Sequence, residues 1–373
     1  MFAKIGEAVR LNRRALLKQD TVIDNNCMAL TPTPAIGDPR FLLKFMQTVD
    51  LSPFAVAMTV PSVRRGDVEG ITMALPPLPE QRRIVAKLDQ LSARSAAARD
   101  HLARTIKLAT RAKQAILAAA FRGDLLGLGT AETVKINARC WDLPEGWRWR
   151  HFEEVATIRS NLCQPSEMPD LPHVAPDNIE AGTGRLLPYN TISEDGVKSG
   201  KHKFFAGQIL YSKIRPYLRK AVIVDFDGAC SADMYPVDCS PEIDIRLLHR
   251  WLISEDFAWF TAEHEGRTVL PKINQRSLNG APIPVPPSEQ QVEIVRRIEA
   301  AFARIELLTE EATRAAHLLN RLDERLLAKA FGGELVPQDP NDEPAEALLA
   351  RIRQTRTTAP NPKRRRPKKT AAG

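Results

Sequence analysis

Two stretches of the chain place apolar or small residues at steps that alternate between four and three positions. This spacing is a heptad pattern and predicts two amphipathic helices, residues 80–121 and 288–331. Each helix would be about 60 Å long at a rise of 1.5 Å per residue. Two such faces in one chain are expected to pack against each other. The predicted contact positions are Ile84, Leu88, Leu91, Ser95, Ala98, Leu102, Thr105, Ala109, Ala112 and Ile116 in the first helix, and Ile294, Ile298, Ala301, Ile305, Leu308, Ala312, Ala315, Leu319, Leu322 and Leu326 in the second.

The two predicted helices also begin and end alike. Each start follows a pair of prolines and contains Glu-Gln, which pairs Glu80 with Glu289. Each end reads Phe-x-Gly-Asp/Glu-Leu, which pairs Phe121 with Phe331. Glu80 and Glu289 are 209 residues apart. A repeat of this length is typical of a duplicated unit of one globular domain plus one helix, and not of a solenoid module.

The segments before the two helices show short apolar runs without βαβ regularity, so the fold class is predicted to be α+β. The expected boundaries are a first globular domain (1–79), a helix (80–121), a linker (122–142), a second globular domain (143–287), a helix (288–331) and a C-terminal segment (332–373). Strands are expected at 22–23, 27–30, 54–60, 173–175, 208–211, 221–225 and 234–237, and helices at 41–49, 245–263 and 345–353.

The first globular domain is expected to be a shortened copy of the second. Phe2-Ala3-Lys4-Ile5 resembles Tyr211-Ser212-Lys213-Ile214, and the stretch that begins at Leu143 in the second copy has no counterpart before Met1. The last residues, 362–369, are strongly basic and are expected to form a disordered tail.

Composition limits the possible functions. A chain of 373 residues usually holds two or three domains. Lys and Arg exceed Asp and Glu by 53 to 45, which is compatible with a polyanionic partner such as nucleic acid. The five cysteines form no metal-binding pattern, and the sequence has neither a signal peptide nor a membrane-length apolar run, so a cytoplasmic protein without a membrane contact is expected.

Sequence motifs for catalysis are also missing. The chain contains no G-x-x-x-x-G-K-[ST] phosphate loop and no Asn/Asp-Pro-Pro-Tyr/Phe methylase motif. The seven histidines do not pair with Cys or Glu at ligand spacing. We therefore expect a protein that is not an enzyme and holds no cofactor of its own.

The repeated unit resembles a known family. Its second copy opens Leu143-Pro-Glu-Gly-Trp147, contains Tyr211-Ser-Lys-Ile-Arg-Pro-Tyr-Leu-Arg-Lys220, and runs into the proline-led helix that ends at Phe331-Gly-Gly-Glu-Leu335. These residues resemble the specificity subunit of type I restriction–modification systems, closely over 143–355 and as a shortened copy over 1–125.

This resemblance implies a function and a set of partners. In that family each globular domain is a target-recognition domain that reads one half of a bipartite double-stranded DNA site. Two antiparallel coiled-coil helices separate the domains and bind two methylation subunits, and restriction subunits join through the complex. S-adenosylmethionine, ATP and magnesium are implied for those partner subunits and not for this chain.

Candidate DNA-binding residues follow from the chemistry of DNA recognition. Arginine suits guanine, asparagine and glutamine suit adenine, and any positioned cation can contact phosphate. Arg215-Pro216 of the second copy is replaced by Gly6-Glu7 in the first, so the two domains are expected to read different bases. The candidates are Lys213, Arg215, Tyr217, Arg219, Lys220, Lys272, Asn274, Gln275 and Arg276 in the second domain, and Lys4, Arg10, Arg13 and Arg14 in the first, followed there by Arg64 and Arg65.

Two other interpretations stay open at this point. The chain could be a truncated remnant that binds partner subunits through its helices and reads no sequence. It could also be a stand-alone basic coiled-coil DNA-binding protein, although this would not account for the duplicated domain.

Overall fold

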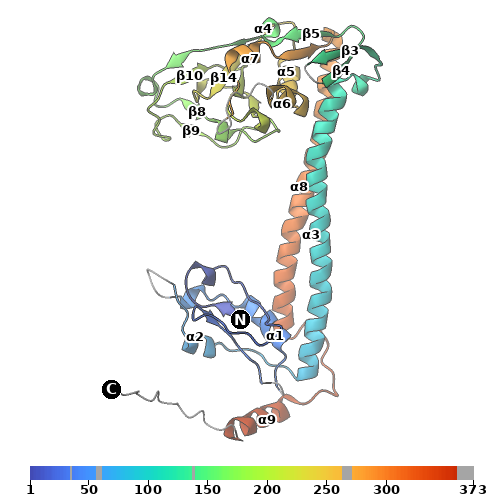
Figure 1. Cartoon of the computed structure of the whole chain (residues 1–373). Coiled ribbons are helices and arrows are strands. Elements are labelled where there is room, and N and C mark those ends of the chain that lie inside the picture. The colour runs from blue at the N-terminus through green and yellow to red at the C-terminus, as the bar shows by residue number, and fades with distance from the viewer. Residues whose placement is uncertain (34–35, 56–60, 137–138, 263–270, 359–373) are drawn as a thin grey trace, which may run out of the picture. The chain divides into compact units, whose positions relative to one another are not determined.

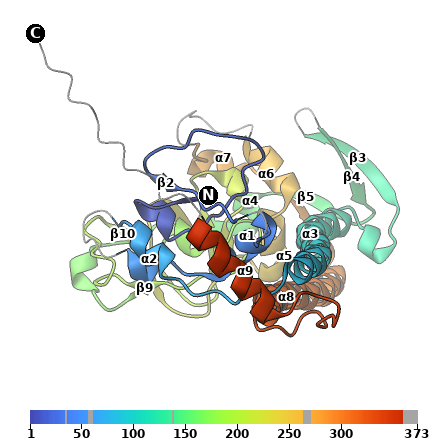
Figure 2. The ribbon, with the colours of Figure 1, turned by 90° about the horizontal axis from the view of Figure 1, so that it is seen from below.

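The protein consists of two units, each built from one globular domain and one end of each of two long helices. The computed structural model describes residues 1–33, 36–55, 61–136, 139–262 and 271–358. One unit comprises Met1–Ala103 and Ala312–Gly373, and the other comprises Arg104–Glu311. The long helices are α3 (Leu78–Phe121) and α8 (Ser288–Phe331), and within each unit they run side by side (Figures 1 and 2).

Both predicted long helices are confirmed to within two residues at each end. Helix α3 begins at Leu78, so Pro79 lies in its first turn, where a missing backbone N–H costs no intrahelical hydrogen bond. Gly123 and Gly333 follow the two helix ends at φ 82° and 79°, a left-handed conformation that terminates a helix and that glycine adopts without strain.

The two helices are antiparallel in each unit. In the first unit, Ile84 and Leu88 near the start of α3 share a buried cluster with Ala330 at the end of α8. In the second unit, Phe121 at the end of α3 is buried in the same cluster as Ile298 near the start of α8. Ion pairs on the outside follow the same arrangement, Arg99 with Asp323 in the first unit and Lys113 with Glu306 in the second.

The heptad assignment is wrong at three positions. Thr105, Leu308 and Leu322 are exposed, and Leu117 is fully buried although it lies outside the predicted contact positions. A straight helix repeats every 3.6 residues, so its buried face drifts away from a strict 3.5-residue pattern along more than five heptads.

The first domain has a small core of its own. Strand β1 (Phe2–Ala3) pairs antiparallel with β2 (Cys27–Met28), and Phe2 packs there with buried Met46. Helix α1 begins at Pro39, two residues before the predicted start at 41, and the Asp38 carboxylate accepts hydrogen bonds from two backbone N–H groups of its first turn. The remaining elements are η1 (Glu7–Val9), α1 (Pro39–Thr48), η2 (Ser52–Phe54) and α2 (Arg65–Glu69).

Two strand predictions in the first domain have a different outcome. The expected strand at 22–23 is wrong: Val22 is 99% exposed and has no apolar surface against which a strand could pack. Of the expected strand at 54–60, Phe54 ends η2, and residues 56–60 lie outside the described part of the chain.

The second domain contains a five-stranded and a four-stranded β-sheet together with helices, in agreement with the α+β assignment. One has the order β7-β10-β13-β8-β9 and the other the order β12-β11-β14-β6. Strands β8 and β13 are parallel, and the other pairs are antiparallel. The strands are β6 (Ala156–Ile158), β7 (Leu162–Cys163), β8 (Pro172–Val174), β9 (Asn190–Thr191), β10 (Lys201–Phe204), β11 (Ile209–Ser212), β12 (Ala221–Ile223), β13 (Gly228–Cys230) and β14 (Met234–Cys239).

Short helices and one further strand pair complete the second domain. Strand β5 (Arg148–His151) pairs with β15 (Pro282–Val285), which connects the opening of the domain to the segment before α8. The helices are α4 (Phe152–Val155), η4 (Pro165–Glu167), η5 (Pro176–Asn178), η6 (Pro216–Leu218), α5 (Ile245–Leu252), α6 (Glu255–Ala262) and α7 (Gln275–Asn279).

The helix predicted at 245–263 is two helices, α5 and α6. Ser254 lies between them, and its hydroxyl donates to the Trp251 carbonyl at 2.7 Å and accepts from the Phe257 N–H at 3.1 Å. Serine at this position caps the start of α6 and therefore favours a break over a continuous helix.

The predicted linker 122–142 is structured at its described residues, 122–136 and 139–142. It contains η3 (Asp124–Leu126) and a strand pair, β3 (Thr130–Ile136) with β4 (Arg139–Pro144). The predicted C-terminal helix is α9 (Ala345–Thr358), whereas the predicted basic tail lies outside the described residues. Within the described residues, no helix is both long and apolar enough to span a membrane.

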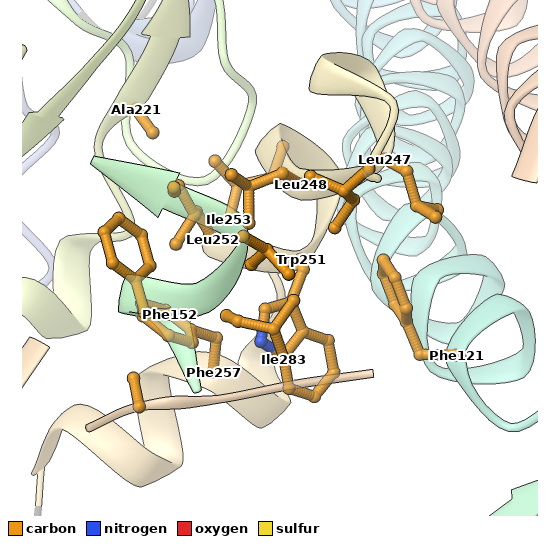
Figure 3. Packing of buried hydrophobic residues seen from close by; sticks show 14 of the residues in the cluster. Phe121, Phe152, Ala221, Leu247, Leu248, Trp251, Leu252, Ile253, Phe257 and Ile283 are labelled. Atoms are coloured by element: carbon orange, nitrogen blue, oxygen red, sulfur yellow. The ribbon is translucent and has the colours of Figure 1, made fainter. Parts of the chain in front are cut away.

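An aromatic residue at the end of each long helix enters the core of its unit. Phe121 of α3 packs edge-on against Trp251 of α5, with ring centroids 4.9 Å apart (Figure 3). Phe331 of α8 lies 5.2 Å from Phe41 and 5.5 Å from Phe45, both on α1. The repeated Phe-x-Gly motif therefore marks an equivalent packing contact in the two units.

Candidate nucleic-acid interface

Two candidate segments of the second domain, distant in sequence, lie side by side. Ile214 and Lys272 form an isolated antiparallel bridge. The Ile273 N–H donates to the Lys213 carbonyl at 2.9 Å, and the Arg215 N–H donates to the Pro271 carbonyl at 2.8 Å. The loop after β11 and the segment that leads into α7 therefore form one continuous surface, which we call the paired loops (residues 213–219 and 271–276).

Asp233 lies between the two lysines of the paired loops. Its carboxylate forms an ion pair of 2.8 Å with Lys272, and its backbone carbonyl accepts a 3.0 Å hydrogen bond from the Lys213 N–H. Burial lowers the pKa of Lys213, and the neighbouring Lys272 adds to the decrease while the Asp233 carboxylate opposes it. The Lys213 ammonium also lies 5.1 Å from the centre of the Tyr235 ring.

Four candidate side chains of the paired loops face solvent. Arg215 has a left-handed backbone (φ 46°), and Tyr217 keeps 50% of its surface exposed. Gln275 and Arg276 are exposed in the first turn of α7, whose N-cap is Asn274, with the Asn274 amide oxygen accepting from the Ser277 N–H at 2.8 Å. Arg215, Gln275 and Arg276 have no side-chain hydrogen bond or ion pair to other described residues.

Two other candidates in the second domain are engaged inside the protein. The Lys220 ammonium donates to the Pro176 carbonyl at 2.6 Å, and only 14% of the Lys220 side chain is exposed. Arg219 forms a 3.2 Å ion pair with Glu255 and packs over Gly182. Lys220 therefore connects the end of η6 to η5, and Arg219 connects it to α6.

The first domain contains the same backbone arrangement. Ile5 and Ser62 form the equivalent bridge, the Gly6 N–H donates to the Pro61 carbonyl at 2.7 Å, and the Val63 N–H donates to the Lys4 carbonyl at 2.8 Å. Gly6 has positive φ (80°), as its equivalent Arg215 does. The Lys4 N–H donates to the Asn26 carbonyl at 2.8 Å, which makes Asn26 the counterpart of Asp233.

The other candidates of the first domain differ in their surroundings. Arg10, the counterpart of Arg219, is exposed and pairs with Glu7 at 3.2 Å, and Arg13 is exposed. The Arg14 guanidinium lies 5.0 Å from the centre of the Phe2 ring, and burial lowers its pKa. Arg14 is therefore part of the packing around β1. Arg64 and Arg65 occupy the positions of Asn274 and Gln275 and are exposed.

Several residues of this surface and its support were missed by the sequence analysis. Asp233 and Tyr235 carry no motif, and only the fold brings them to Lys272 and Lys213. Gln81 and Gln291 lie inside the repeated start of the long helices, so the internal repeat was a signal that could have identified them. The described residues contain no group of three or more His, Cys, Asp or Glu side chains that could hold a metal ion.

Comparison with known proteins gives a consistent result. The family model for the type I restriction modification DNA specificity domain matches residues 13–107 and 144–315. The chain is 40% identical over 332 residues to the type I restriction enzyme EcoDI specificity subunit of Escherichia coli, covering 83% of this chain and 74% of that protein. It is 26% identical over 339 residues to the EcoBI specificity subunit of Escherichia coli, covering 84% of this chain and 70% of that protein.

A solved structure shows the same fold. A chain in a structure concerned with complex assembly and conformational transition of the type I R-M system superposes with a TM-score of 0.63 at 22% identity, over 80% of this chain and 72% of that one. The family model matches twice, once around each globular domain, as the internal repeat predicts. The chain therefore belongs to the family of type I restriction–modification specificity subunits.

Proposed function

We propose that this chain gives a type I restriction–modification complex its DNA sequence specificity, with each domain reading one half of a split double-stranded site. The observation that carries the proposal is the paired-loop surface. It presents Arg215, Tyr217, Gln275 and Arg276 to solvent, with the cations Lys213 and Lys272 behind them. This combination supplies forked side chains for base edges and positive charge for phosphates.

The candidate residues of the second domain have different proposed roles. Arg276 and Gln275 contact bases, because they are exposed at the start of a short helix and can move without breaking a hydrogen bond inside the domain. Lys213 and Lys272 neutralise phosphates. Arg219, Lys220 and Asn274 position the loops through their internal contacts and do not reach bases.

In the first domain, Lys4 takes the role of Lys213, and Arg64 and Arg65 occupy the start of α2. Arg10 and Arg13 contact phosphates, whereas Arg14 supports β1. The two domains share a backbone and differ at nine of the thirteen positions of the paired loops. They are therefore expected to select different half-sites.

The long helices are proposed to bind two methylation subunits, one in each unit. Leu108 on α3 and Leu318 on α8 are equivalent positions of the repeat, and they are 60% and 56% exposed. A single exposed leucine is common on protein surfaces, but the same exposed leucine recurs at the equivalent position of both copies, which supports a shared binding role. Restriction subunits join through the complex, and S-adenosylmethionine, ATP and magnesium are bound by partner subunits.

Co-expression with the cognate methylation subunits tests the main proposal. We expect adenine methylation at one split sequence across the genome, dependent on this chain. Arg215→Ala combined with Arg276→Ala should abolish or relax recognition of one half of the methylated sequence. Lys198→Ala, an exposed change elsewhere in the second domain, should leave recognition unchanged. A complex that assembles without any sequence-dependent methylation would instead favour the truncated remnant.

The proposed binding of methylation subunits has its own test. Leu108→Glu and Leu318→Glu should each remove one methylation subunit, and the double variant both, as measured by native mass spectrometry. Ala96→Glu, another exposed change on α3, serves as the control. Unchanged stoichiometry in the double variant would exclude these leucines from the interface.

A further inference from the structure

Each long helix carries a buried glutamine in its first turns that holds the adjacent globular domain. In the first unit, Gln81 Oε1 accepts from the Asp38 N–H at 2.8 Å, and Gln81 Nε2 donates to the carbonyls of Ile36 and Pro76 at 2.9 and 2.8 Å. The side chain is fully buried. One amide therefore connects the start of α3 to the turn at residues 36–38 of the first domain and to Pro76, just before the helix.

The second unit repeats this arrangement. Gln291 Oε1 accepts from the Asp244 N–H at 2.7 Å, and Gln291 Nε2 donates to the carbonyls of Glu242 and Pro286, both at 2.9 Å. Gln291 is 4% exposed. The equivalence of Gln81 and Gln291 corrects the predicted register of the repeat, because Glu80 now corresponds to Gln290 and not to Glu289.

The glutamine contact acts on one particular helix of each domain. Asp38 and Asp244 are the N-caps of α1 and α5, so the amide fixes the starts of these two helices. Their other ends are held by aromatic contacts, Phe331 with Phe45 on α1 and Phe121 with Trp251 on α5. Each of these helices is thus attached to the helix pair by a buried amide and an aromatic contact. Surface ion pairs add to them, Arg40 and Lys44 with Asp89 in the first unit and Arg246 with Glu299 in the second.

The two kinds of contact constrain the domain differently. Apolar packing is non-directional and allows a domain to rotate by small amounts with little loss of buried area. Three hydrogen bonds to one planar amide require fixed distances and angles. Each amide is buried, unlike the surface ion pairs, and therefore restricts the angle of its domain on the helix pair without competition from water.

We infer that Gln81 and Gln291 are positioning residues that set the gap between the two half-sites by fixing each recognition domain on its own helices. This inference rests on the function proposed above. On this inference, the two buried amides determine how much the gap length can vary, and other residues determine which bases are read.

The test is a binding selection with a double-stranded DNA library that has a randomised centre, using the complex with methylation subunits. Wild-type protein should enrich one split motif with one gap length. The Gln81→Leu and Gln291→Leu variants should enrich the same half-site bases as the wild type. Their affinity for targets with a gap one base pair shorter or longer should be within about tenfold of their affinity for the original target. Gln90→Leu, an exposed change on α3, should behave as wild type.

A milder variant guards against loss of folding. Gln291→Asn keeps the amide but shortens the side chain, so it cannot reach all three partners at once, and it should broaden the gap distribution in the same direction. An unchanged gap preference, or an equal loss of binding at every gap length, would overturn the inference while leaving the proposed function intact. A wild-type complex that enriches no split motif would overturn the proposed function and this inference with it.

Discussion

The two recognition domains use the same backbone contacts to present different side chains. In both, the loop that carries Lys4 or Lys213 bonds to a segment that leads into a short helix. In the second domain, Asp233 and Lys272 form an ion pair. The equivalent positions of the first domain hold the uncharged residues Asn26 and Ser62. The comparison indicates that backbone hydrogen bonds maintain the loop geometry, while the loop side chains are free to differ and so to read different sequences.

The largest expected effect comes from charging equivalent core positions of the two helices. Leu88 and Ile298 are 2% and 0% exposed. Leu88→Asp and Ile298→Asp should each destabilise the protein by about 3–5 kcal/mol, because each leaves an unpaired charge in an apolar interior. Thermal unfolding measures the loss.

The size of the loss should differ between the units. Ile298 belongs to the larger apolar cluster and should give the greater effect. Ala86→Asp and Ala300→Asp, exposed changes on the same helices, are the controls and should change stability little. Equal, small effects from all four variants would contradict the packing described above.

Acid should destabilise the second domain selectively. His249 of α5 is buried against the Ala221 carbonyl, with a 3.0 Å contact from its Nε2, and burial lowers its pKa to about 4. The unfolded chain, with a histidine pKa near 6.5, binds a proton that the folded domain excludes. The buried neutral His249 therefore does not lower the free energy of unfolding above pH 6.5. As the pH falls toward 4, the free energy of unfolding decreases by about 3 kcal/mol.

The first domain supplies the control for this pH effect. The position equivalent to His249 in α1 is Leu43. His249→Leu should reduce the pH dependence between 6.5 and 4, measured by chemical unfolding across that range, and His202, whose pKa burial also lowers, should account for part of what remains. A slope that persists in the variant would assign the effect to other groups.

A smaller change is expected for Arg276→Ala. The side chain is exposed and has no partner among the described residues, so assembly and stability should be unchanged. Binding should weaken by about 1–3 kcal/mol, with relaxed preference at one base of one half-site. Quantitative DNA binding with single-base variants of the target would detect this, and an unaltered preference would remove Arg276 from the reading surface.

The smallest effect concerns the ion pair that distinguishes the two loop surfaces. Asp233→Asn and Lys272→Ser convert the second domain to the pair found in the first. Both side chains are about one-third exposed, so a double-mutant cycle of unfolding free energies should give a coupling of about 0.2–1 kcal/mol. DNA binding should respond differently: Asp233→Asn should strengthen it, because the two lysines lose a competing carboxylate, and Lys272→Ser should weaken it.

The sequence alone determined the features that depend on local order. Heptad spacing predicted α3 and α8, and the repeated motifs predicted a duplicated unit and its family. These signals are local because helix periodicity and caps involve residues only a few positions apart.

Only the tertiary structure decided which distant segments meet. It placed Lys272 beside Ile214, brought Asp233 to Lys272, buried Gln81 against Asp38, and left Leu308 and Leu322 exposed. It also separated the candidates that face solvent, such as Arg276, from those engaged internally, such as Lys220. These outcomes depend on how elements pack and on where the buried face of a long helix drifts, and neither is encoded in the neighbouring residues.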